Sequence, residues 1–313
     1  MEIVNILNKS RIILKSAIIL VMILLLSLPM FKIDQLIMDR EARNKEVRKE
    51  FAQKWGGKQN ITSPTLKIPY HFANDFSTQY FYLTPEVLEI NGEVFPQVKK
   101  RGIFEVPVYS SNIDIKGYFE PARIKEFADR KEVIIDYDNI VLYQRMTDFT
   151  KLNKGIQLKW NDQTHKLKLK EEWYVGHAVN IDEASLRNEF SYSINFNGVE
   201  DISFSPEANE VNVTMKGEWD NPSCFGTRMT NNYTNEEGTF VAEWKYLNQL
   251  ERDWDSSPLL NQGDNEFGVN FMMANDHYAK SHRSTKYAFL LIGLTFVAFF
   301  FLELITKKNI HPL

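Results

Sequence analysis

Cysteine is almost absent from this chain of 313 residues, in which Cys224 is the only one. An intramolecular disulfide and a zinc site built from several cysteines are therefore excluded. An excess of basic charge is also lacking, because 37 Lys and Arg residues stand against 41 Asp and Glu residues. A protein that coats nucleic acid needs a basic surface, so we expect no nucleic-acid partner.

The sequence also lacks the short motifs of the common enzyme classes. It contains no GxGxxG, GxxxxGK[ST], HExxH, GxSxG or SxxK pattern, and these patterns carry phosphate binding, zinc binding or nucleophilic catalysis. The histidines are scattered, and none lies beside Cys224. Glu171 and Glu172 are adjacent, so on a strand they would point to opposite faces. We therefore predict no catalytic residue, no metal site and no cofactor.

Long apolar runs are present, one near each end of the chain. The first extends to Ile33 and the second covers Tyr287 to Ile305. Each is long enough to cross a hydrocarbon core of about 30 Å, and neither carries the polar stripe of a core helix. We predict transmembrane helices over residues 12–33 and 286–306. A cleaved signal peptide is the alternative for the first run, but no small-x-small cleavage site follows it.

Basic residues flank both runs on their short sides. Because short positive flanks stay in the cytoplasm, residues 1–11 and 307–313 are expected to be cytoplasmic. The long segment between the runs is then extracytoplasmic. At the membrane interface we expect Lys and Tyr on the outer side and an acid–base pair on the inner side. The residues assigned to the interface are Lys286, Tyr287, Glu303 and Lys307.

Residues 34–55 form a charged segment without Pro or Gly, which predicts a helical stalk ended by Gly56 and Gly57. Acid-first pairs spaced four residues apart support the helix, and an apolar stripe runs along it. The stalk is either a solvated spacer or a helix that docks this stripe on the domain or on a second copy. The pairs are Asp39/Arg43, Glu41/Lys45 and Glu50/Lys54, and the stripe is Val47, Phe51 and Trp55.

After Gly57 the hydrophobic pattern alternates with period two, as in the runs 104–108, 113–119, 166–170 and 211–219. This alternation predicts half-buried strands. Residues 121–131 are a helical window. We therefore predict a β-dominated domain over residues 58–280, built as a sandwich or as two sheet lobes. A weak repeat between residues 112–121 and 212–222 is consistent with two lobes or with two similar hairpin ends in one sheet.

Turns are predicted between the strands wherever Gly, Asn or Pro cluster. These turn signals are Asn91-Gly92, residues 153–155, Asn197-Gly198 and residues 220–222.

Tryptophans are the remaining candidates for function. Exposed aromatic rings could stack on glycan or peptide, although in a β domain of this size most rings fill the core. Trp219 and Trp244 are expected in the core. The candidate binding surface is formed by Trp160, Trp173 and Trp254.

Several segments together resemble the CreD family of inner-membrane proteins, which is associated with cell-envelope integrity. The most specific are RGIFEVPVY at 101–109, the W-x-x-P-S-x-F-G string at 219–226 and TKYAFLLIGLTF at 285–296. The chain departs from the family pattern at Ser63-Pro64, where Gly-Pro is usual, and in the loop 226–237. Family members continue into further membrane helices beyond the final IHPL, so this chain resembles a truncated form.

The resemblance implies a bacterial inner-membrane location with a periplasmic domain, but no established reaction. The first hypothesis is a non-catalytic envelope-integrity protein whose domain binds or braces an envelope component. The alternatives are a signal-coupling module, in which ligand binding changes the two membrane helices, and an envelope glycan or peptide hydrolase with an unrecognised site. The expected partners are the lipid bilayer and other envelope proteins or glycan.

Overall fold

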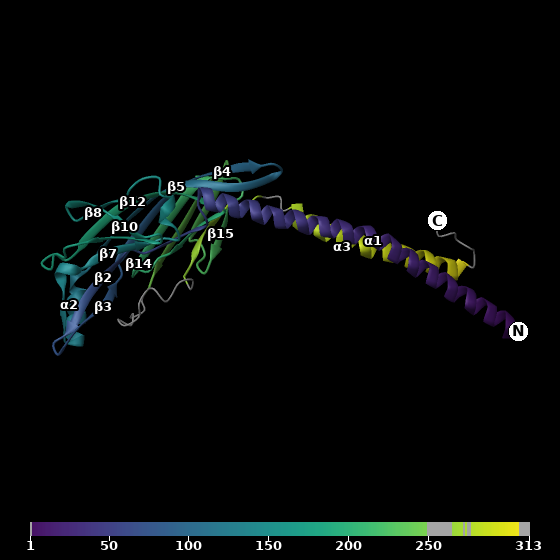
Figure 1. The fold of residues 1–313 in the computed structure, drawn as a ribbon, viewed down its shortest axis with the longest axis horizontal. Helices are drawn as coiled ribbons and strands as arrows, with labels where there is room; N and C mark the ends of the chain where they lie inside the picture. Colours follow the sequence, from purple (N-terminus) through teal and green to yellow (C-terminus); the bar gives the residue numbers. More distant parts are fainter. Residues whose placement is uncertain (1, 249–264, 272, 274–276, 307–313) are drawn as a thin grey trace. The chain divides into compact units, whose positions relative to one another are not determined.

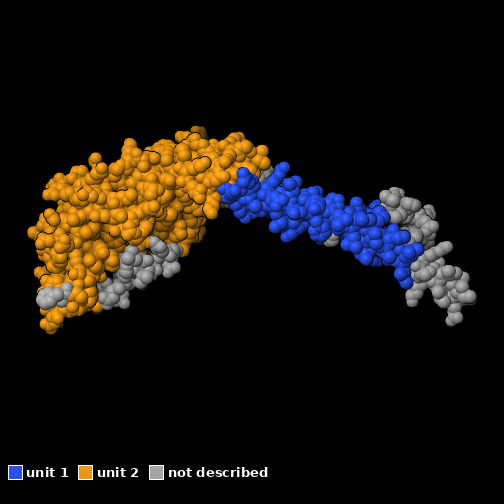
Figure 2. Space-filling view, viewed as in Figure 1, with its two compact units in different colours: residues 1–46, 274–313 blue, residues 47–273 orange. Residues whose placement is uncertain are grey.

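The computed structural model describes residues 2–248, 265–271, 273 and 277–306. The chain divides into two compact units (Figure 2). One comprises residues 1–46 and 274–313, and the other comprises residues 47–273. The first contains the two apolar helices, and the second is the β domain.

Two long helices carry the apolar runs (Figure 1). Helix α1 covers Glu2–Trp55 and helix α3 covers His277–Thr306. Both are long and apolar enough to cross a membrane, over windows inside residues 16–55 and 280–302. The predicted stalk is therefore a direct continuation of the first apolar helix, as the absence of Pro and Gly from residues 34–55 indicated.

The β domain consists of three sheets that share one large buried core. An eight-stranded sheet has the order β16-β17-β14-β4-β5-β12-β8-β9. Its strands are β4 (Val87–Arg101), β5 (Phe104–Phe119), β8 (Gln157–Trp160), β9 (Gln163–Lys166), β12 (Asn188–Val199), β14 (Glu210–Glu218), β16 (Asn232–Glu236) and β17 (Thr239–Leu247).

The second sheet has six strands in the order β10-β11-β7-β2-β3, with β6 paired to β2. Its strands are β2 (Thr65–Phe72), β3 (Asp75–Leu83), β6 (Val133–Ile135), β7 (Val141–Arg145), β10 (Lys168–Glu171) and β11 (Tyr174–Ala178).

The third sheet is small and has the order β1-β13-β18-β15. Its strands are β1 (Gln59–Thr62), β13 (Asp201–Ser205), β15 (Ser223–Gly226) and β18 (Phe267–Asn270). Strand β1 runs parallel to β13, whereas β18 is antiparallel to it. The three sheets together confirm the predicted β-dominated fold.

The longest pairing is the β4–β5 hairpin, which continues as an antiparallel ladder from Val87 to Arg101. Gly102, with a φ of 62°, makes its turn. Alternating residues of β5, such as Ile113 and Ile115, are buried, as the period-two pattern predicted. The hairpin therefore forms the centre of the eight-stranded sheet.

Helix α2 (Pro121–Lys131) coincides with the predicted helical window. Pro121 lies in the first turn, where its missing N–H costs no hydrogen bond. Ile124 and Phe127 are buried, and the Phe127 ring stacks on Phe81 of β3 at 4.1 Å between centroids. Two 3₁₀ turns follow at Tyr137–Asn139 and Phe149–Lys151.

Two predicted turns are wrong. Asn91-Gly92 lies inside β4, and Asn197-Gly198 lies inside β12. Both glycines are needed for close packing instead: a Cβ on Gly92 would lie 2.1 Å from the Met215 sulfur, and one on Gly198 would lie 2.3 Å from the Tyr109 ring. Residues of the weak repeat lie in β5 and β14, which flank β4 in the same sheet. The repeat therefore does not mark two lobes.

Candidate functional site

The last turns of α1, residues 47–55, pack against the β domain. Val47 is buried with Val106, Val108 and Val199, and Phe51 and Trp55 pack beside this cluster. The predicted apolar stripe of the stalk is therefore a docking surface for the domain and not part of a solvated spacer. The free energy of this contact comes from removing branched and aromatic side chains from water.

Polar contacts fix the rotation of this helix end. The indole N–H of Trp55 donates to the backbone oxygen of Tyr109 at 3.1 Å, and the Lys99 ammonium lies 5.3 Å from the Trp55 ring centre. Arg101 pairs with Glu50. The predicted pair Glu50/Lys54 is thus replaced by a contact to the hairpin, whereas Glu41/Lys45 forms at 2.8 Å.

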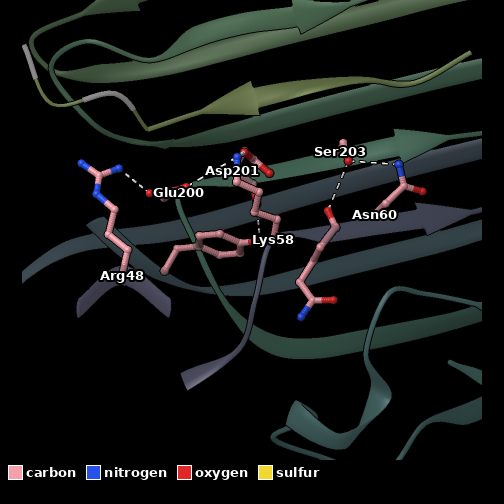
Figure 3. A network of polar contacts seen from close by, with 8 residues as sticks. Arg48, Lys58, Asn60, Glu200, Asp201 and Ser203 are labelled. Carbon is pink, nitrogen blue, oxygen red and sulfur yellow. Dashed lines mark hydrogen bonds and ion pairs between the residues drawn. The ribbon is translucent and has the colours of Figure 1, made fainter. Parts of the chain in front are cut away.

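A sharp corner at Glu200 receives the next contacts (Figure 3). Glu200 has a φ of 64° and connects β12 of the large sheet to β13 of the small sheet. Arg48 of α1 pairs with Glu200, and Lys58 reaches Asp201 at 2.5 Å and Glu200 at 3.5 Å. Two cations from the end of α1 and the loop after it therefore hold two acids at the corner. We call these four residues the junction network.

The electrostatics of the junction network are set by unequal burial. The Asp201 side chain is 10% exposed, whereas that of Lys58 is 59% exposed. Burial raises the pKa of Asp201, although Lys58 acts to lower it. Burial acts to lower the pKa of Lys58, but Asp201 and Glu200 together raise it. The two acids therefore favour the protonated form of Lys58, and Lys58 in turn favours the ionised form of Asp201 against the effect of burial.

Tyr109 lies beneath the network and is fully buried. Its hydroxyl donates to the backbone oxygen of Asp201 at 2.8 Å, and burial raises its pKa well above the usual value. Beside it, the amide side chain of Gln59 is buried without a hydrogen-bond partner among the described residues. The absence of a side chain at Gly198 leaves room for the Tyr109 ring.

Both apolar helices are connected along the chain to strands of the small sheet. Only Gly56, Gly57 and Lys58 separate α1 from β1, and β18 ends at Asn270, shortly before α3. Strands β1 and β18 are the two neighbours of β13. The corner also bonds both chain segments, because Val199 N–H donates to Gly57 oxygen at 3.2 Å and Phe271 N–H donates to Glu200 oxygen at 2.7 Å.

Within the helical unit, α1 and α3 contact each other at one end of their apolar runs, at Asp34 and His282. The Oδ1 atom of Asp34 on α1 lies 2.6 Å from the Nδ1 atom of His282 on α3. Less exposed residues recur every three or four positions along each helix, as in a packed helix pair. These residues are Ile19, Ile23, Ser27, Met30, Asp34 and Ile37 on α1, and His282, Thr285, Ala288, Ile292, Phe296 and Phe300 on α3.

The family profile described as "Inner membrane protein CreD" matches residues 11–313. This match covers nearly the whole chain. The chain belongs to the CreD family. The Inner membrane protein CreD of Escherichia coli (strain K12) is 25% identical, over 93% of this chain and 68% of that protein.

Solved structures add little to this CreD-family assignment. An M1 zinc metallopeptidase from Deinococcus radiodurans aligns with a TM-score of 0.25 and 9% identity, over 52% of this chain and 38% of that one. A substrate-bound structure of the same peptidase gives the same TM-score with 8% identity. A likeness this low carries no argument about fold or reaction.

Two of the three tryptophans predicted as the candidate binding surface, Trp160 and Trp173, lie among the described residues. The structure places Trp160 in the core, 3% exposed, with its indole N–H donating to Asn180 oxygen at 2.8 Å. Its alternating position on a strand points it inward. Trp173 is 43% exposed and lies over the Arg145 guanidinium, with 5.8 Å between its ring centre and Cζ. Trp254 lies outside the described residues.

The predicted interface residues lie on or after α3. Lys286 and Tyr287 are exposed. Glu303 lies in the last turns of α3, but its side chain and the whole of Lys307 are outside the described residues. Gly293 of α3 has nothing within 4 Å of an added Cβ.

Metal-ligating residues do not cluster in the part of the chain that the structure describes. No group of three or more His, Cys, Asp or Glu residues there could hold a metal ion. Cys224 is half-buried on β15, and burial raises the pKa of its thiol. The site that sequence reasoning missed is the junction network. The acidic pair Glu200-Asp201 after Asn197-Gly198 was its one visible signal.

Proposed function

We propose that this protein is a non-catalytic envelope-integrity protein of the bacterial inner membrane. Its two apolar helices cross the membrane with both chain ends in the cytoplasm, and its β domain lies in the periplasm. There the domain binds or braces an envelope component. The observation that carries the proposal is that both helices lead into strands flanking β13 and bonded at the same corner.

Two attachments at one corner suit a bracing function. A domain held by a single helix can rotate about that helix, whereas two connections to one small sheet resist rotation. A restricted domain also meets membrane-bound partners at a higher effective concentration. The docked helix end and the junction network hold the last turns of α1 on the β domain, because Arg48 and Lys58 pair with the corner and Trp55 donates to Tyr109.

The orientation is supported by the basic flanks and the apolar windows. Protease added to spheroplasts of the host bacterium tests it. Cleavage within residues 58–280 and protection of tags at both ends are expected. Protection of the domain, or exposure of either tag, contradicts the proposed topology.

The bracing role is tested in a strain that lacks this protein. We expect the full chain to restore resistance to detergent, and a chain that ends at residue 273 to remain in the membrane with a folded domain but restore less. Equal protection by both chains contradicts the need for two attachments. Full protection by the untethered domain alone would contradict membrane bracing altogether.

A second candidate, the signal-coupling module, is favoured by the contact between Asp34 and His282. A ligand that moved the small sheet would pull on both helices and alter this contact. Cysteine cross-linking between α1 and α3 near these positions tests the idea. A cross-linking rate that changes when envelope material is added supports coupling, and an unchanged rate contradicts it.

A further inference from the structure

Arg145 is a buried cation at the end of β7. The residue is 6% exposed. Its backbone oxygen accepts hydrogen bonds from the Gln144 amide at 2.7 Å and the Thr62 hydroxyl at 3.4 Å. Its guanidinium has no ion pair and no hydrogen bond to the residues that the structure describes. A buried charge without a partner is costly, so such a group calls for an explanation.

The guanidinium is not sealed from solvent. Its nitrogens are not among the fully buried side-chain atoms that lack a partner within the described part of the chain. Since they have no partner there either, they retain access to solvent. Solvent access is the condition that an external anion needs in order to reach them.

One aromatic ring lies over this cation, and two further aromatic residues leave the same face of the sheet. Trp173 lies over it, and Trp173 and Tyr174 pack together with 4.8 Å between ring centres. Tyr174 is the register partner of Arg145 across β11 and β7, so both side chains leave the same face of the sheet. Tyr143 leaves that face two residues earlier.

None of these rings supplies a counter-charge. Burial is the largest cause that raises the pKa of Tyr143 above its usual value, with Tyr82 second, while Arg145 acts in the opposite direction. The phenol therefore stays neutral. The charge of Glu207 also raises the pKa of Tyr143. Glu171 and Glu172, next to Trp173, are exposed and do not pair with Arg145.

We propose that Arg145 and Trp173 form a binding site for an anionic saccharide, an inference that rests on the proposed role in binding an envelope component. The planar guanidinium offers two parallel N–H donors to a carboxylate or phosphate. The exposed side of the indole offers a flat apolar surface to the C–H face of a sugar ring. A neutral sugar would leave the cation unpaired, so the charged group determines affinity.

Binding to the detergent-solubilised full chain tests the site, measured by calorimetry with three probes. Glucuronic acid carries a carboxylate, glucose 1-phosphate carries a phosphate, and glucose is the neutral control. We expect one or both anions to bind at least about tenfold more tightly than glucose, since charge-assisted bidentate bonds are the strong ones. Equal binding of all three, or binding of none, overturns the proposal.

Two variants of the site assign the contacts. Trp173→Leu removes a half-exposed ring and should weaken anion binding about fivefold without affecting the fold, as the loss of one aromatic contact predicts. Arg145→Lys keeps the charge but loses the planar fork and should weaken it about tenfold. Affinity unchanged by Trp173→Leu overturns the site, even if Arg145→Lys fails to fold.

The matched control is the exposed aromatic–cation pair formed by Tyr80 and Lys67, whose ammonium lies 3.8 Å from the ring centre. Tyr80→Leu should leave binding unchanged, and an equal loss there would show a diffuse surface effect and overturn the assignment. The acids at 251, 253, 255 and 264 lie outside the described residues. If neutralising them to amides raised affinity at least about tenfold, Arg145 would be an internal partner and the proposal would be overturned.

This test is independent of the proposed bracing role. Loss of saccharide binding with the spheroplast topology and detergent resistance intact removes the site alone. Correct saccharide binding by a chain that fails both cellular tests removes the bracing role alone.

Discussion

Two charged side chains are buried among the described residues of the β domain, and the structure compensates them in opposite ways. Asp201 at the corner receives Lys58 at 2.5 Å and belongs to a network that anchors α1. Arg145 on the six-stranded sheet has only the Trp173 ring above it within the described residues. The first charge is neutralised by the chain itself. The second has no ion pair with the described residues, and we propose that a ligand supplies its partner.

The difference separates an architectural role from a binding role. A paired acid at a strand corner specifies how helix and sheets meet, and its pairing holds whether or not a ligand is present. An unpaired cation lowers stability and is retained only where another function requires it. The same type of change, cation to methionine, should therefore have opposite effects at Lys58 and Arg145.

Tyr109→Ala should break the corner most severely. The ring is fully buried and bonded to Asp201, so its loss should lower the free energy of unfolding by about 3–5 kcal/mol. Urea unfolding followed by tryptophan fluorescence measures this, because all six tryptophans lie within residues 47–273. Tyr80→Ala, an exposed control, should cost about 0.5 kcal/mol. Equal costs would show that the corner is not a centre of stability.

Lys58→Met should also destabilise the domain, but less. It leaves Asp201 without its partner, and we expect a loss of about 1–2 kcal/mol after allowing for the exposure of Lys58. Asp201→Asn in the same background should remove most of this loss, since no carboxylate then needs a cation. A double-mutant cycle in urea measures the coupling. Additive losses would mean that the pair contributes nothing.

Arg145→Met should have the opposite sign. It replaces an unpaired buried cation by an apolar side chain of similar length, and we expect a gain of about 1 kcal/mol in the free energy of unfolding. The same urea assay, run beside Lys58→Met, measures it. A loss comparable to that of Lys58→Met would show that Arg145 is paired within the chain and would remove the contrast between the two regions.

His177 is a third partly buried basic residue, and it carries a charge only when it is protonated. Its ring lies 4.7 Å from that of His165. Burial lowers its pKa below 6.5, followed by the nearby bases His165, Lys168 and Lys170. Because the folded state then binds fewer protons than the unfolded state, protonation of His177 favours unfolding. This residue therefore causes no loss of stability above pH 6.5, and it lowers the free energy of unfolding as the pH falls below that value.

His177→Asn should reduce this loss of stability, the smallest of the expected effects. Urea midpoints at about pH 7.5 and about pH 5.5 measure it for the wild type and the variant. A midpoint that falls equally in both proteins shows that other groups cause the acid sensitivity.

Local patterns in the sequence determined the elements. Period-two alternation located β5 and β14, because one buried face imposes it on any strand. Helix α2 was located by its apolar spacing and its initial proline, and the apolar runs by their length alone. The stripe formed by Val47, Phe51 and Trp55 was predicted from its spacing of four residues. The surface of the β domain on which it docks could not be predicted.

Tertiary structure decided everything that depends on residues far apart in the chain. Gly92 and Gly198 looked like turn residues, yet they serve close approaches by Met215 and Tyr109 from other strands. The sequence could not show that Lys58 reaches Asp201, or that Arg145 reaches no acid that the structure describes. The partner of a charged residue cannot be predicted from its neighbours in the sequence, because strand pairing decides which distant residues lie next to it. The sequence by itself determined the helices, several of the strands and the apolar runs, and only the packed sheets decided which charges are paired.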